Sequence, residues 1–210
     1  MAFTPSRLAM PHTITTLSTP MAGQKQGSSI FRVVLTGAES TGKTTLAQAL
    51  AAHYDTVWAP EYLRQFVDDK GSLPVASDTP LIARGHLVQE EHYRRRARHV
   101  LFLDTDLVST CLYHQHFFGT PPGWVLKQAG ERRADLYLLM NTDIPWVSDP
   151  GQRDGPATRD IMHSLFLAAM AAVPHVVISG AFKQRFPDAV RHVDHLLGPY
   201  GRSITQRKPT

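Results

Sequence analysis

Apolar runs of strand length recur along the chain and are separated by segments with helical spacing. Four runs are apolar at both alternating positions, as buried parallel strands are, and they span 31–36, 99–104, 134–140 and 174–179. A shorter run of the same kind spans 56–59. The pattern therefore predicts a parallel β-sheet of five strands.

The segments between these runs place apolar residues three or four positions apart, as in Leu46 and Leu50, which is typical of helices with one buried face. Asp78 or Thr79 followed by Pro80 is a start signal for one of these helices. Because strands and helices alternate, we predict an α/β fold with helices on both faces of the sheet.

The length of 210 residues suits one well-buried core, and we expect a single domain over residues 30–198. Residues 1–29 are rich in Ser and Thr and free of acidic residues, which predicts a disordered tail. Residues 199–210 predict a basic C-terminal tail. The stretch 141–157 carries three prolines and two glycines, so we expect an ordered loop or lid there.

The formal net charge of +4 does not by itself predict a nucleic-acid-binding surface. The two tails hold five basic residues without nearby acids, enough to leave the rest of the chain slightly negative: Arg7, Lys25, Arg202, Arg207 and Lys208. In the basic run 93–99, Glu90 and Glu91 stand four residues ahead of Arg94 and Arg95, which is typical of a solvated helix face. We therefore expect no nucleic-acid partner.

Cysteine content and hydropathy indicate the compartment. Cys111 is the only cysteine, so no disulfide forms within the chain, and we expect a reducing, cytoplasmic environment. No apolar stretch has the length needed to cross a bilayer, so we expect no membrane partner. Cys111, His114 and His116 do not predict a zinc site, because helix positions i and i+2 point apart.

Residues 37–44, GAESTGKT, match the G-x-x-x-x-G-K-[ST] phosphate-binding loop between a predicted strand and a predicted helix. In such a P-loop NTPase fold the backbone amides and the helix N-terminus hold phosphate. Lys43 should reach the β- and γ-phosphates, and the Thr44 hydroxyl should bind Mg²⁺. The sequence thus predicts ATP and Mg²⁺ as cofactors, with ATP held by Gly37, Ala38, Glu39, Ser40, Thr41, Gly42, Lys43, Thr44 and Thr45.

The remaining acidic residues favour a small-molecule kinase over other P-loop proteins. A GTPase usually carries N-K-x-D after a later strand, and the segment 138–146 has nothing of that form. A mechanical ATPase is normally longer. Asp104 ends the predicted strand 99–104, where a metal-holding aspartate is expected, and Asp106 follows at the same edge.

Glu61 follows the predicted strand 56–59 and should lie at the same sheet edge. Arg64 is one helical turn further on, where it holds either Glu61 or a phosphate. Glu61 is equally explained as a carboxylate that stabilises a helix start, with Arg64 as its i, i+3 partner. In a kinase, Glu61 and Asp106 would share the work of binding the acceptor hydroxyl and accepting its proton, and we predict both as catalytic and substrate-binding residues.

Five segments in order and spacing resemble the ribosylnicotinamide kinase domain of NadR-type proteins: GAESTGKTTL, WAPEYLRQFV, FLDTDLVST, ADLYLLMNTDIPWV and DPGQRDG. The resemblance covers about residues 31–197. It implies a P-loop kinase fold with a five-stranded parallel sheet. It also implies transfer of the ATP γ-phosphate to the 5′-hydroxyl of nicotinamide riboside, giving nicotinamide mononucleotide.

The chain departs from the family in two places. Long members carry an adenylyltransferase domain and sometimes a DNA-binding domain ahead of the kinase, which the segment before residue 30 is too short to hold. We therefore expect neither direct NAD synthesis nor repression. The family often has two aspartates after Trp-Val, whereas Ser148 stands at the first position and Asp149 at the second.

The loop 141–157 supplies the remaining candidate residues. Trp146 should stack on a cationic pyridinium ring, with Asp149 as a nearby carboxylate; ordinary packing is the alternative for Trp146. Arg153 is predicted to stabilise transition-state charge. Arg159 either stabilises the same transition-state charge or is a solvated helix residue.

Two alternatives to nicotinamide riboside kinase activity stay open on the residues alone. One is a non-catalytic or regulatory nucleotide-binding protein, and the other is a kinase for a different nucleoside. Phosphate transfer to a panel of ribosides distinguishes them, because a regulatory protein binds nucleotide without turnover. Oligomeric state and the choice of ATP or GTP are not predicted.

Overall fold

The computed structural model of the chain describes residues 29–147 and 155–199. Residues 1–28 and 200–210 of the predicted tails, and loop residues 148–154, lie outside these ranges. The predicted domain limits therefore stay predictions.

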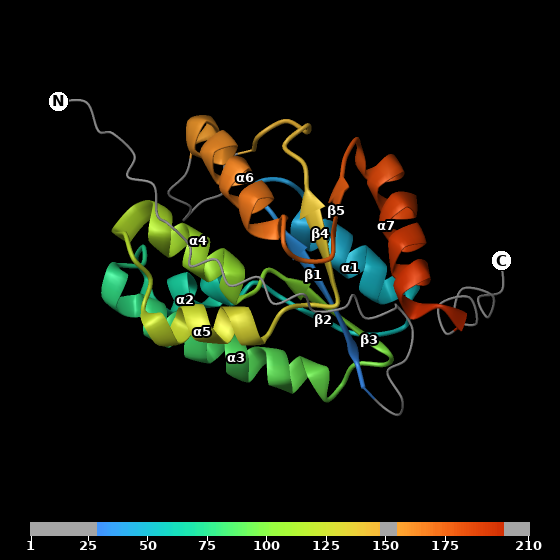
Figure 1. Ribbon diagram of the computed structural model, residues 1–210, viewed down its shortest axis with the longest axis horizontal. Helices are drawn as coiled ribbons and strands as arrows, with labels where there is room; N and C mark the ends of the chain where they lie inside the picture. Colours follow the sequence, from blue (N-terminus) through green and yellow to red (C-terminus); the bar gives the residue numbers. More distant parts are fainter. Residues whose placement is uncertain (1–28, 148–154, 200–210) are drawn as a thin grey trace.

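The five strands of the described ranges form one parallel sheet in the order β2-β3-β1-β4-β5 (Figure 1). They are Phe31–Thr36 (β1), Trp58–Ala59 (β2), Val100–Asp104 (β3), Leu136–Met140 (β4) and His175–Ile178 (β5). The predicted five-stranded α/β sheet is confirmed. β2 is shorter than the predicted run 56–59, because the Thr56 amide donates to Ala51 at the end of the preceding helix.

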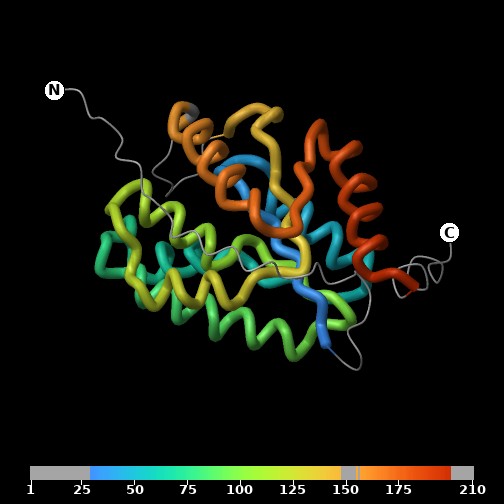
Figure 2. Tube along the Cα trace, viewed as in Figure 1, coloured from blue at the N-terminus to red at the C-terminus, as the bar shows by residue number. Residues whose placement is uncertain are grey.

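Helices cover both faces of this sheet (Figure 2). Within the described residues they are Lys43–His53 (α1), Tyr62–Lys70 (α2), Thr79–Arg94 (α3), Leu107–Phe118 (α4), Gly123–Glu131 (α5), Pro156–Met170 (α6) and Phe182–Leu197 (α7). α3 begins at the predicted place, with Asp78 as N-cap and a proline in the first turn. α6 begins at Pro156, so the last two residues of the stretch 141–157, which we predicted as a loop, are helical.

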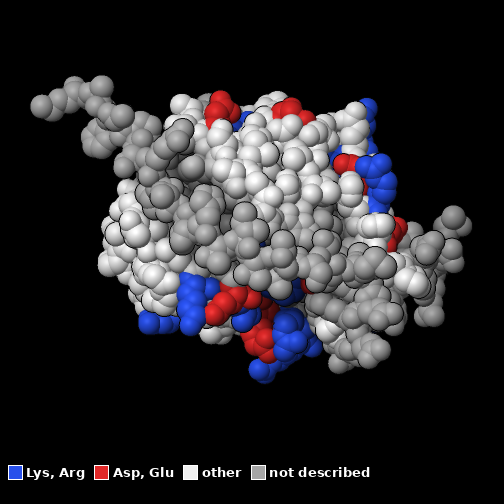
Figure 3. Space-filling view, viewed as in Figure 1, with Lys and Arg blue, Asp and Glu red and all other residues white. Residues whose placement is uncertain are grey.

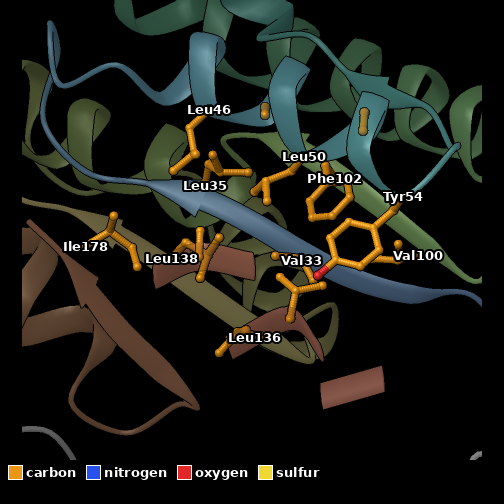
Figure 4. Packing of buried hydrophobic residues seen from close by; sticks show 14 of the residues in the cluster. Val33, Leu35, Leu46, Leu50, Tyr54, Val100, Phe102, Leu136, Leu138 and Ile178 are labelled. Atoms are coloured by element: carbon orange, nitrogen blue, oxygen red, sulfur yellow. The ribbon is translucent and has the colours of Figure 1, made fainter. Parts of the chain in front are cut away.

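The alternation of side chains along β1 divides the core into two layers. Val33 and Leu35 face α1 and α7, where they pack against Leu46 and Leu50 (Figure 4). Val34 points to the opposite face and packs with residues of α6 such as Phe166. All six side chains are fully buried, and their removal from water holds β1 at the centre of the fold. The carboxyl end of β1 is thereby fixed where the phosphate loop begins.

Charged side chains of α3 form only part of the predicted solvated pairs, because Glu90 is buried and pairs with Arg32 and Arg132 instead of Arg94. Glu91 accepts from Arg94 at 2.7 Å and from Arg95 at 2.9 Å. On the face drawn in Figure 3, basic atoms lie beside acidic ones rather than in one broad basic field. Among the described residues, no helix combines the length and the apolar character needed to cross a membrane.

Candidate functional site

The phosphate loop connects β1 to α1 and has a backbone that requires glycine. Gly37 has φ of 127°, and a Cβ there would lie 2.9 Å from the Met140 carbonyl oxygen of β4. Gly42 has φ of 79° and precedes the first residue of α1. L-residues rarely adopt such φ values, so this loop path needs glycine at both positions.

The loop forms one end of a cavity of about 520 Å³. Ala38 is fully buried and does not line it, but its carbonyl accepts from Thr41 Oγ1 at 2.7 Å and from Lys43 Nζ at 2.8 Å. The cavity wall therefore includes every predicted phosphate-loop residue except Ala38: Gly37, Glu39, Ser40, Thr41, Gly42, Lys43, Thr44 and Thr45.

Asp104 lies at the end of β3, beside the first turn of α1. The Thr44 hydroxyl donates to Asp104 Oδ2 at 2.5 Å, so the two predicted metal-binding residues are in contact. Asp104 is 1% exposed, and its Oδ1 has no hydrogen-bond partner among the described residues. Burial raises the pKa of Asp104, while the charge of Lys43 opposes that rise.

Glu61 and Arg64 form the wall of the cavity beside the phosphate loop. Arg64 Nε donates to Glu61 Oε2 at 3.1 Å, and both side chains line the cavity. Glu61 is the N-cap residue of α2, but its side chain makes no capping hydrogen bond. Burial raises the pKa of Glu61 and so does the charge of Asp104, whereas Lys43 and Arg64 lower it. Glu61 thus lies within electrostatic range of the phosphate-loop lysine.

Asp106 is one of the predicted site residues that do not line the cavity. It is the N-cap of α4, where its Oδ1 accepts from the amides of Val108 at 3.0 Å and Ser109 at 3.3 Å. Its Oδ2 accepts from the Tyr137 hydroxyl at 2.8 Å. Asp106 is 4% exposed and is not part of the cavity wall. These internal bonds support the start of α4, and the predicted role of Asp106 at the acceptor stays a prediction.

The far half of the cavity lies between α2, α3 and α4 and was missed by the sequence analysis. Tyr113 and Phe117 of α4 stack at 6.4 Å between ring centroids. His114, considered above only as a zinc ligand, lines the same space and shares a 2.7 Å hydrogen bond with Thr79. Further lining residues of this half are Leu63, Val67, Ile82, His86 and Phe118. The available sequence signal was the aromatic content of residues 113–118.

The loop after β4 reaches the phosphate loop. The Val147 amide donates to Ser40 Oγ at 2.8 Å, and Val147 lines the cavity. Trp146 is half-buried and is not part of the cavity wall, so its stacking role stays a prediction. Arg159 is 6% exposed and therefore is not the solvated helix residue of the alternative. Asp149 and Arg153 lie outside the described residues.

Comparisons with known proteins agree with this geometry. Residues 32–185 match the family described as AAA domain. The chain is 36% identical over 121 residues to the trifunctional NAD biosynthesis/regulator protein NadR of Escherichia coli (strain K12), which covers 56% of this chain and 30% of NadR. The Salmonella typhimurium NadR is 35% identical over 122 residues, with the same coverage. The chain thus matches less than a third of the length of these relatives.

Solved structures share the fold. A NadR protein in complex with NR has a TM-score of 0.68 at 20% identity, and covers 80% of this chain and 52% of that one. Thymidylate kinase from Candida albicans has a TM-score of 0.59 at 10% identity, and covers 79% of this chain and 91% of that one. Both likenesses concern the fold, a P-loop kinase arrangement. With the match spanning most of the sheet and the phosphate loop, the chain belongs to the AAA domain family and is a NadR-like P-loop protein.

Proposed function

We propose that this protein transfers the γ-phosphate of ATP to the 5′-hydroxyl of nicotinamide riboside. The observation that carries the proposal is one cavity whose wall includes both the phosphate loop and the stacked rings of Tyr113 and Phe117. Glu61 lies in the same wall. A flat cationic base suits the aromatic end, because aromatic faces attract cations.

The proposed transfer depends more on the orientation of the acceptor hydroxyl than on the basicity of the carboxylate that accepts its proton. The 5′-oxygen forms a bond to the γ-phosphorus, the bond from that phosphorus to the bridging oxygen breaks, and ADP leaves. Lys43 and the loop amides bind the phosphate oxygens on which charge is spread. Glu61 orients the hydroxyl and accepts its proton, for which a raised pKa is favourable.

Thr44 and Asp104 are the residues that would hold Mg²⁺. Both supply oxygen donors, and the buried Asp104 Oδ1 has no hydrogen-bond partner among the described residues. No group of three or more His, Cys, Asp or Glu residues within 29–147 and 155–199 is arranged to hold a metal. Mg²⁺ fits even so, because it keeps several waters and uses substrate phosphates as ligands. When bound, it would neutralise charge on the β- and γ-phosphates.

Asp104→Asn is expected to raise the Mg²⁺ concentration needed for half-maximal activity by about tenfold, about 1.4 kcal/mol. The amide keeps the volume and an acceptor for Thr44 but loses the negative charge. Activity titrated against MgCl₂ at saturating ATP measures the shift. An unchanged Mg²⁺ requirement in a folded variant would show that Asp104 does not hold the metal.

Steady-state ADP release with a panel of acceptors tests the proposal itself. Nicotinamide riboside should give the highest kcat/KM, ahead of uridine, thymidine and deoxyadenosine. Neighbouring folds include thymidylate kinase and a deoxyadenosine kinase, so preference for one of these other acceptors would assign the site to another nucleoside. Nucleotide binding without turnover on any acceptor would favour the regulatory alternative.

Phe117→Leu is expected to raise the KM for nicotinamide riboside by up to about thirtyfold. Cation–π attraction contributes about 0.5 to 2 kcal/mol, and leucine keeps the apolar contact while removing the π face. Uridine carries no ring charge and should lose less. Phe182→Leu on α7 is the matched control, since this exposed ring lies outside the cavity wall.

The same measurement on Trp146→Ala decides the role of Trp146. A selective loss for nicotinamide riboside at unchanged melting temperature indicates stacking on the base. Equal losses for both acceptors with a lower melting temperature indicate packing. If Phe117→Leu impairs both acceptors equally, the charged ring does not bind at α4.

A further inference from the structure

Two buried arginines from α6 and α7 reach the outer side of the phosphate loop. Arg159 is 6% exposed and Arg185 is 3% exposed. Neither lines the cavity. Burying a guanidinium is costly unless its donors are paired, so the partners of these side chains indicate their purpose.

The partners are mainly backbone carbonyls. Arg159 donates to Ser40 O at 3.1 Å and to Ile144 O at 2.9 Å. Arg185 donates to Thr41 O at 2.6 Å, to Gly180 O at 2.5 Å and to Asn141 O at 3.0 Å, and forms an ion pair with Asp143. The two arginines therefore hold consecutive carbonyls of the phosphate loop.

Each of these carbonyls belongs to a peptide group whose amide is on the next residue. The carbonyl of Ser40 shares its peptide with the amide of Thr41, and the carbonyl of Thr41 shares its peptide with the amide of Gly42. A cationic donor on the oxygen of a peptide polarises it and makes its N–H a stronger donor. It also fixes the plane of the peptide. This matters here because Ser40, with φ of 52°, has a strained backbone, and Gly42, with φ of 79°, has a backbone that glycine leaves free to rotate.

We propose that Arg159 and Arg185 are positioning residues that orient the peptides 40–41 and 41–42 and strengthen their amides as donors to the nucleotide phosphates. They act without touching the nucleotide. The same side chains join the loop to the segment after β4, since Ile144 and Asn141 accept from them and the Val147 amide donates to Ser40. The phosphate loop and residues 141–147 thus form one braced unit.

The test measures binding of an unreactive ATP analogue by calorimetry, with no acceptor present. Arg159→Met and Arg185→Met should each raise its Kd by about tenfold, and the lysine variants, which keep the charge, should recover part of the loss. Because no acceptor is used, this result is independent of whether nicotinamide riboside is the substrate. Arg94→Met on the exposed surface of α3 is the matched control and should leave the Kd within twofold.

Amide spectra give a readout that general destabilisation does not reproduce. In ¹⁵N-labelled protein, Arg159→Met should shift the Thr41 nitrogen resonance selectively, and Arg185→Met the Gly42 resonance. Arg159 makes fewer hydrogen bonds than Arg185 to the described residues, so its variants and Arg185→Lys carry the test if Arg185→Met does not fold. A folded Arg159→Met with wild-type Kd and an unshifted Thr41 amide would overturn the proposal.

Discussion

Lys43→Ala is expected to reduce phosphoryl transfer by at least about a thousandfold while the protein stays folded. Lys43 is the first residue of α1 and donates from the cavity wall to the Ala38 carbonyl. Its loss removes about 4 kcal/mol of stabilisation from the charge that develops on the transferred phosphate. The apolar residues of α1 that bury against the sheet are untouched, so the melting temperature should change little.

The measurement is kcat/KM for ATP with thermal unfolding in parallel. Lys127→Ala removes an exposed lysine of α5 as the matched control and should leave both quantities unchanged. Lys43→Arg should remain strongly impaired, because a planar guanidinium does not reproduce a compact ammonium. Transfer at close to the wild-type rate in Lys43→Ala would contradict the phosphate-loop assignment.

Glu61→Gln is expected to lower kcat by about a hundredfold, whereas Asp106→Asn should leave kcat within about threefold. Both changes replace a carboxylate by its amide, so each is the control for the other. Only Glu61 lines the cavity, where it would orient the acceptor hydroxyl. Equal kcat losses in the two variants would place Asp106 at the acceptor site, and a loss below about tenfold in Glu61→Gln would move that site away from Glu61.

The pH profile offers a second signature of Glu61. Burial raises its pKa above the ordinary value, so the ionised form is lost as pH falls through that raised value. The kcat/KM of the wild type should therefore fall on the acidic side at a higher pH than an ordinary carboxyl would give. Glu61→Gln should lose this acidic limb. A limb that persists in the variant belongs to another group.

Asp106→Ala, unlike Asp106→Asn, should lower the free energy of unfolding by about 1 to 3 kcal/mol. It removes the N-cap of α4 and leaves the buried Tyr137 hydroxyl without its acceptor. Thermal unfolding measures the loss, which should exceed that of Asp106→Asn because asparagine still accepts at an N-cap.

The sequence by itself determined the sheet and the phosphate loop, since both depend on local pattern. Buried parallel strands need apolar residues on both faces, and the loop needs glycine where φ is positive. β2 was the strand that the sequence predicted least well, because a strand of two residues shows little periodicity. The nearby Thr56 is held by its side chain, which donates to the Val100 carbonyl.

The tertiary structure decided which groups the carboxylates of Asp104 and Asp106 contact. Asp104 and Asp106 flank Thr105, whose φ of 70° turns the chain between strand and helix, so that Asp104 faces Thr44 and Asp106 points into α4. No two-residue spacing predicts this turn. The contribution of α4 to the cavity was likewise missed, because α4 packs against α3, α5 and α6 and has apolar residues on several faces instead of one stripe.

The two arginines that contact the phosphate loop could not be predicted from the sequence either. Arg159 and Arg185 lie 119 and 144 residues from the carbonyls they hold, and a backbone carbonyl has no sequence signature. The motif thus determined where the phosphate loop lies, because its pattern is in consecutive residues. The aromatic part of the cavity and the contacts behind the loop were decided only when the packing of α4, α6 and α7 brought distant side chains together.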